Sequence, residues 1–127
     1  VNKIVQVSSN VITSRSEEST RGRITGTVAE YQEYARERCA VYGWSDNDFS
    51  SLVKLWNRES GWNPNTRNSS SGAYGIPQAL PASKMASAGS DYMTNYKTQI
   101  NWGLSYIRSR YGSPSSAWSY FQSNGWY

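Results

Sequence analysis

The sequence has no histidine and only one cysteine, Cys39, among its 127 residues. The lack of histidine excludes Ser-His-Asp and Cys-His hydrolases, and it also excludes zinc sites that combine Cys with His. A single cysteine cannot close a disulfide within the chain. The three Asp and six Glu are scattered and show no calcium-loop spacing, so we expect neither a metal site nor a cofactor.

Long hydrophobic runs and strong charge are also missing from this sequence. No stretch approaches the ~18 apolar residues of a membrane-spanning helix, so we expect no membrane span. The net charge is +4, and the Lys and Arg residues are spread along the chain without the basic-aromatic alternation that favours nucleic-acid binding. We therefore expect no nucleic-acid partner, and we expect a monomer.

Aromatic residues, by contrast, are abundant, with six Trp and ten Tyr. Aromatic side chains at this density fill the core of a small domain well. They also line carbohydrate-binding grooves, because the C–H faces of sugar rings stack on flat apolar surfaces. We expect most of them in the core and a minority in a groove.

The chain divides into an N-terminal arm or linker at residues 1–26 and a mostly α-helical domain at residues 27–127. The arm combines short β-prone patches with a Ser-, Arg- and Glu-rich run, which predicts at most a short strand. The domain shows helical periodicity with cap and stop signals, interrupted by a polar loop at 61–75. Helices are expected at about 28–42, 46–60, 95–111 and 114–121, with a short one that begins near Gln78 or Pro81 and ends by Gly89. The face of the first helix that we expect to be buried carries Val28, Tyr31, Ala35, Cys39 and Tyr42.

One acidic residue, Glu59, lies within the apolar stripe of the expected helix 46–60. The other members of the stripe are Phe49, Leu52, Val53, Leu55 and Trp56. We expect this helix to be the most buried one, with Gly61 and Pro64 as its stop signals. Burial and the negative end of the helix dipole both disfavour a charged carboxyl group here, so both raise the pKa of Glu59. A raised pKa is what a general acid needs.

Three short motifs follow one another along the chain: Glu59-Ser60, Gly75-Ile76-Pro77-Gln78 and Ala117-Trp118-Ser119. Their order and spacing resemble the lytic transglycosylases of the goose-type lysozyme superfamily. In that family a catalytic Glu-Ser pair closes a helix, a Gly-Leu-Met-Gln motif follows, and an Ala-Tyr-Asn motif comes later. Here the second motif has Pro in its third place, and the third motif has Trp for Tyr and Ser for Asn. The Gly-Ile-Pro-Gln form and the closing Gly-Trp-Tyr are similar to an actinobacterial and phage-like branch.

The resemblance implies a small, mainly α, lysozyme-like domain with a long polar loop after the catalytic helix and at most a minor β element. It implies cleavage of the β-1,4 bond between MurNAc and GlcNAc of peptidoglycan, with Glu59 as the single acid and base. The product would be a 1,6-anhydroMurNAc end, because the C6 hydroxyl of the sugar replaces water. It also implies a secreted or cell-wall-associated protein. The residues expected to contact the substrate are Ser60, Tyr74, Gly75, Gln78, Trp118 and Tyr120.

Several of these residues have a second, structural interpretation. Ser60 can hydrogen-bond the nearby backbone, Gln78 can bond at a helix start, and Trp118 can pack in the core. Tyr120 can also orient Glu59 through its hydroxyl.

Two other functions remain open. A hydrolytic muramidase needs a second carboxylate, and helix capping already explains Asp46 and Asp48, which leaves Asp91 as the helper. Alternatively, the domain binds peptidoglycan without cutting it, and Glu59 has a structural role.

Overall fold

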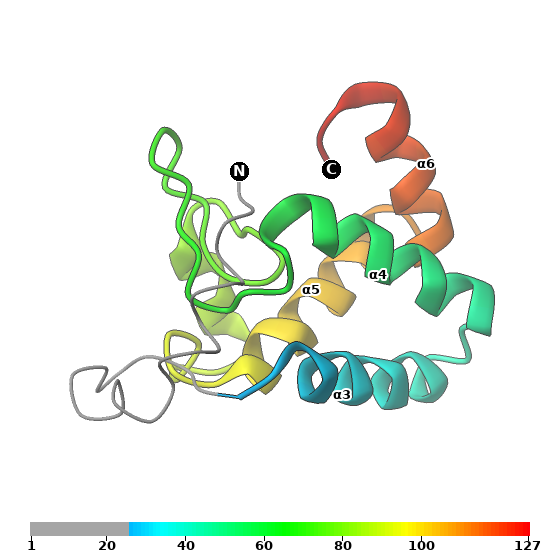
Figure 1. Cartoon of the computed structure of the whole chain (residues 1–127), viewed down its shortest axis with the longest axis horizontal. Helices are drawn as coiled ribbons and strands as arrows, with labels where there is room; N and C mark the ends of the chain where they lie inside the picture. The colour runs from blue at the N-terminus through cyan, green and yellow to red at the C-terminus, as the bar shows by residue number, and fades with distance from the viewer. Residues whose placement is uncertain (1–25) are drawn as a thin grey trace.

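The computed structural model describes residues 26–127, so the arm expected at residues 1–26 lies, apart from residue 26, outside the described residues. The described part is mainly helical, as predicted (Figure 1). None of its helices is long and apolar enough to cross a membrane. The elements, in order, are α3 (Val28–Val41), α4 (Asp46–Ser60), the 3-10 helix η1 (Ala82–Ser87), α5 (Tyr96–Arg110) and α6 (Pro114–Asn124). All five expected helices are present, with ends shifted by a few residues.

Side-chain caps set the starts of α3 and α4. Thr27 and Glu30 form the expected capping box at α3, and Ser45 and Asp48 form another at α4. Asp48 also accepts a hydrogen bond from the backbone N–H of Ser115 at the start of α6, at 3.3 Å. The capping interpretation of Asp48 is therefore confirmed.

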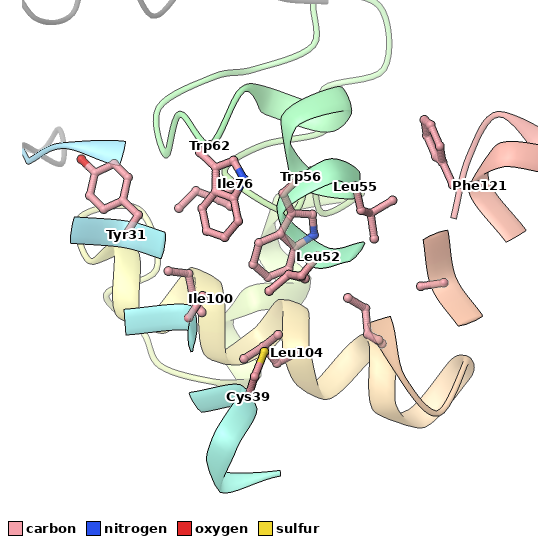
Figure 2. Close-up of a cluster of buried hydrophobic side chains, with 13 residues drawn as sticks. Tyr31, Cys39, Leu52, Leu55, Trp56, Trp62, Ile76, Ile100, Leu104 and Phe121 are labelled. Carbon is pink, nitrogen blue, oxygen red and sulfur yellow. The ribbon is translucent and has the colours of Figure 1, made fainter. Parts of the chain in front are cut away.

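Residues of α3, α4, α5 and α6 form one core, and its centre holds two tryptophans (Figure 2). Trp56 of α4 and Trp62 of the following loop meet edge to face, with ring centroids 5.2 Å apart. Gly103 of α5 allows Trp56 this position, because a Cβ at Gly103 would lie 2.5 Å from its Cζ2 atom. Val28, expected on the buried face of the first helix, is 38% exposed, since α3 meets the core only from Tyr31 onward.

The most buried helix is α5, so the expectation that helix 46–60 holds this place is wrong. The two helices have the same length, but α5 buries six residues and α4 buries four. The loop after α4 folds back over α5 and covers it. Gln99 of α5 accepts a hydrogen bond from the Ile76 N–H at 2.9 Å and donates one to the Pro64 oxygen at 3.0 Å.

The loop between α4 and η1 turns sharply where the helix ends. Gly61 caps α4 in a left-handed conformation, with φ 66°, and its N–H donates to the Trp56 oxygen at 3.1 Å. The expected minor β element consists of two isolated bridges, Arg67–Tyr74 and Tyr74–Ala79. These bridges fold the loop back toward the end of α4.

Candidate active site

A cavity of about 430 Å³ opens where the end of α4 meets the loop, α5 and the segment after α6. These parts are distant in sequence but close in space, and the C-terminus ends near the last turn of α4 (Figure 1). The lining combines aromatic rings, small loop residues and three charged side chains. Its residues are Arg58, Glu59, Asn68, Ser71, Ala73, Pro77, Gln78, Ala79, Leu80, Lys84, Trp102, Tyr106, Phe121, Gly125, Trp126 and Tyr127.

Glu59 lies in the last turn of α4 and lines this cavity. Burial of the half-buried side chain raises the pKa of Glu59 from 4.5 to about 7, against a smaller opposing effect of the neighbouring Arg58. Within the described residues no ion pair reaches its carboxyl group, because the one ion pair there joins Arg36 to Glu33 at 4.0 Å. The raised pKa agrees with the place of Glu59 in the apolar stripe. A carboxyl group in this state holds a proton that it can donate near neutral pH.

Tyr127 joins three parts of the chain beside Glu59, and the sequence did not identify it as a site residue. Its hydroxyl accepts a hydrogen bond from Trp56 Nε1 at 2.7 Å and donates one to the Pro77 oxygen at 3.0 Å. Its main-chain oxygen accepts from the Tyr106 hydroxyl at 2.7 Å. Burial raises the pKa of Tyr127 well above its usual value, and the charge of Glu59 adds to this rise. The only signal in the sequence was the closing Gly-Trp-Tyr, which the family resemblance includes.

Aromatic rings form much of the remaining cavity wall. Trp102 and Tyr106 of α5 stack with centroids 5.1 Å apart and an interplanar angle of 17°. Trp126 also lines the cavity. Flat rings of this kind suit the C–H faces of sugars. The sequence predicted that some aromatics would line a groove, but these three were not among those named.

Gln78 of the second motif lines the cavity and is held by the loop backbone. Its amide nitrogen donates to the main-chain oxygens of Thr66, at 3.1 Å, and Gly75, at 2.9 Å. No hydrogen bond to its side-chain oxygen forms within the described residues. Its φ of 58° is unusual for a residue other than glycine, a strain that often occurs at functional sites.

Gly75 lies behind the cavity wall and not among the lining residues. Its φ is 84°, and a Cβ at this position would lie 2.7 Å from Gln99 Oε1. Glycine therefore lets the loop pass directly over the buried Gln99 side chain.

Ser60 and Tyr74 are buried and also stand outside the cavity lining. The Ser60 hydroxyl donates to the Ile76 oxygen at 2.8 Å, which ties the end of α4 to the second motif. Tyr74 lies under Arg67, whose guanidinium carbon is 4.8 Å from the ring centroid. The structure places both residues where they support the loop.

Trp118 and Tyr120 support the wall from α6, since neither is part of the lining. Trp118 stacks on Phe121 with centroids 5.7 Å apart, and Phe121 lines the cavity. Tyr120 meets Trp126 edge to face, with ring centroids 5.1 Å apart.

No Asp or Glu side chain besides Glu59 lines the cavity within residues 26–127. Asp91 is exposed and accepts hydrogen bonds from Thr98, at 2.7 Å, and from Asn95, at 2.9 Å. These bonds hold the pKa of Asp91 below its usual value. Asp91 is therefore a charged cap beside the start of α5.

A family model of the transglycosylase SLT domain matches residues 44–123, which is more than half of the chain. The chain belongs to this family. It is a peptidoglycan lytic transglycosylase with a lysozyme-like helical fold, as the three motifs predicted. Neither a curated protein nor a solved structure matches the chain.

The match to the transglycosylase SLT domain contains Glu59 and Gln78, but the wall of the cavity extends beyond it. Trp126 and Tyr127 follow the matched range and nevertheless line the cavity. At the other end, α3 precedes the match, although Tyr31 and Cys39 belong to the common core. The folded transglycosylase domain thus includes elements on both sides of the family match.

Proposed function

We propose that Glu59 is the single acid and base that cuts the β-1,4 bond between MurNAc and GlcNAc and leaves a 1,6-anhydroMurNAc end. One observation carries this proposal. Glu59 has a pKa raised to about 7, and it is the only Asp or Glu side chain among the described residues that line the cavity. Such a group can give up a proton and later take one back at neutral pH.

The reaction then needs no second carboxylate. Protonated Glu59 gives its proton to the glycosidic oxygen, and the bond between this oxygen and C1 of MurNAc breaks. The N-acetyl oxygen of the sugar stabilises the anomeric carbon. The ionised Glu59 next takes the proton of the C6 hydroxyl, whose oxygen bonds to C1. This step closes the 1,6-anhydro ring, restores protonated Glu59 and consumes no water.

The walls of the cavity supply the contacts that orient a sugar for this step. The stacked pair of Trp102 and Tyr106 offers a flat face for a pyranose ring. The side-chain oxygen of Gln78 can accept a hydrogen bond from a hydroxyl or an N-acetyl N–H group. Tyr127 excludes water from one side of Glu59, which keeps the acid protonated.

The alternative of a hydrolytic muramidase depends on Asp91, which is exposed and absent from the lining. An inverting enzyme needs its second carboxylate ~6.5–9.5 Å from the acid, and a retaining enzyme needs it closer. Among the described residues, no Asp or Glu side chain other than Glu59 lines the cavity, so none can replace Asp91 in this role. A domain that only binds peptidoglycan has no need of a proton donor in its cavity, whereas Glu59 lines this cavity with a pKa raised to about 7.

We also propose that the protein acts outside the cytoplasmic membrane, as a secreted or cell-wall-associated enzyme, because peptidoglycan lies there. Fractionation of the producing cells tests this location. Activity confined to the cytoplasmic fraction would contradict it.

Mass spectrometry of digested peptidoglycan tests the chemistry directly. We expect anhydromuramyl ends from the wild type and a loss of about 10²–10⁴ in rate from Glu59→Gln, which cannot donate the proton. Asp91→Asn is the matched control and should keep both the rate and the product. Reducing ends that disappear in Asp91→Asn would establish the hydrolytic alternative. Full activity of Glu59→Gln would eliminate the catalytic role of Glu59, and a wild type that cuts no glycan would leave only a binding role.

A further inference from the structure

Two positively charged side chains line the cavity, and neither forms an ion pair within the described residues. The charged residues of its lining are Arg58, Glu59 and Lys84. Both basic side chains are exposed, and the only ion pair within the described residues lies on α3, between Arg36 and Glu33. The side chains of the lining therefore carry a net positive charge, which is larger when Glu59 is protonated.

The two cations come from different elements of the wall. The guanidinium of Arg58, on the last turn of α4, lies 5.5 Å from the centroid of Phe121, and this aromatic face holds it at the cavity. Lys84 lies on η1, which the buried Met85 anchors to the domain. An anionic group on a ligand in the cavity can thus meet charge from the α4 wall and from the η1 wall.

We propose that Arg58 and Lys84 form a carboxylate-binding subsite that recognises the acidic groups carried by the muramyl residues of the strand. This inference rests on the function proposed above. A muramyl residue carries a lactyl group that ends in a free carboxylate, or in an amide when a stem peptide is attached, and the stem peptide brings carboxylates of its own. Arginine binds a carboxylate through two parallel N–H bonds, and lysine binds it as a compact point charge. The subsite selects acidic over neutral glycan.

Three substrates with the same sugar backbone test the subsite. The first is glycan strands that carry stem peptides. The second is the same strands after an amidase has removed the peptides. The third is these peptide-free strands with their lactyl carboxylates converted to amides. The variants are Arg58→Gln, Lys84→Gln and the double variant. Lys54→Gln is the matched control, because Lys54 is an exposed lysine of α4 that does not line the cavity.

We expect each subsite variant to raise KM and to lower kcat/KM about tenfold on at least one acidic substrate, with a larger loss in the double variant. Measured well below pH 7, where Glu59 is protonated with or without Arg58, the variants should match the wild type on the amidated strands within about twofold. Lys54→Gln should match it on all three substrates. The difference in kcat/KM between the wild type and the subsite variants on acidic strands should shrink at high ionic strength, because salt screens exposed charges.

The arms of the experiment identify the carboxylate. A loss on peptide-bearing strands alone assigns it to the stem peptide, and a loss on peptide-free strands assigns it to the lactyl group. An equal loss on amidated strands, or variants that match Lys54→Gln everywhere, would overturn the subsite. Glu59→Gln keeps the two proposals apart: if it is inactive while the Arg58 and Lys84 variants match the control, the subsite is wrong and the proposed function stands.

Discussion

At the scale of single residues, the acidity of Glu59 depends on side chains supplied by the rest of the fold. Its pKa is raised to about 7 because the carboxyl group is buried, while Arg58 opposes the rise. Tyr127, whose hydroxyl is held by Trp56 and Pro77, lines the same cavity at the end of the chain, and the charge of Glu59 raises the Tyr127 pKa. Placement of Glu59 in an apolar stripe predicted the direction of the shift. The place of Tyr127 in the same cavity was not predictable from a local pattern.

The pH dependence of the reaction should report the proton on Glu59. Because the first step needs the protonated acid, we expect kcat/KM to fall as the pH rises through about 7. Tyr127→Ala should admit water to the Glu59 carboxyl group and lower its pKa, so the fall of kcat/KM (the descending limb of the pH profile) should move to lower pH. Tyr127→Phe keeps the ring and should leave the limb in place. The measurement is the rate of release of soluble fragments from cell walls between pH 4 and pH 9, with circular dichroism to monitor folding.

A Tyr127→Ala profile that superimposes on that of the wild type would contradict the role of the ring in excluding water. Tyr127→Phe removes the hydroxyl and leaves Trp56 Nε1 and the Pro77 oxygen without this partner. We therefore expect a loss of about 1–3 kcal/mol in its free energy of unfolding.

At the scale of elements, the loop after α4 takes its shape from the helices on which it lies. Gln99 of α5 binds the loop at Ile76 and Pro64, and Ser60 of α4 binds it at Ile76 from the other side. These anchors fix the backbone that carries Gln78. The loop has no periodicity in the sequence, which predicts only a polar loop. Nothing in its sequence indicates that Gln99 of α5 is the side chain that organises it.

Substitution of Gly75 tests the fit between the loop and α5. Gly75→Ala places a Cβ 2.7 Å from Gln99 Oε1 at a φ of 84°, so it should displace the loop and lower kcat/KM by at least about tenfold. Gly43→Ala is the matched control, because Gly43 has a similar φ of 82° and a Cβ added there would meet no atom within 4 Å.

Denaturant unfolding and the fragment-release assay separate the two effects in these glycine variants. Gly43→Ala should lower the free energy of unfolding by about 1–2 kcal/mol, because alanine is strained at a positive φ, and it should keep its activity. Gly75→Ala should lose more stability than this and most of its activity. Equal losses of stability in the two variants would show that the close approach to Gln99 does not matter.

At the scale of the whole molecule, the active site lowers the stability of the protein at neutral and alkaline pH. The unfolded chain ionises Glu59 near pH 4.5, whereas the folded protein holds the proton until about pH 7. Folding is therefore favoured below the unfolded pKa, and this contribution is lost as the pH rises through the folded one. A shift of this size corresponds to about 3 kcal/mol in the free energy of unfolding.

Glu59→Gln should consequently be more stable than the wild type above pH 7. Glutamine resembles the protonated acid in shape and has no charge to bury, so the gain should approach about 3 kcal/mol at pH 8 and vanish below pH 4. Thermal or denaturant unfolding across this range measures it. Glu37→Gln, at an exposed position on α3, is the control. A Glu59→Gln variant whose stability follows that of the wild type at every pH would show that the carboxyl group is well solvated.

The sequence by itself determined the helices, the catalytic candidate and the family. Helix ends depend on neighbouring residues, such as the capping box of Thr27 and Glu30, and the apolar stripe that contains Glu59 is a periodic pattern on one helix. The tertiary structure decided which side chains enclose the site. The bond between Trp56 and Tyr127 spans 71 residues, and the one between Gln99 and Ile76 spans 23. Contacts of this separation arise only when whole elements pack together, which is why α5 is the most buried helix and Trp118 stands behind the cavity wall.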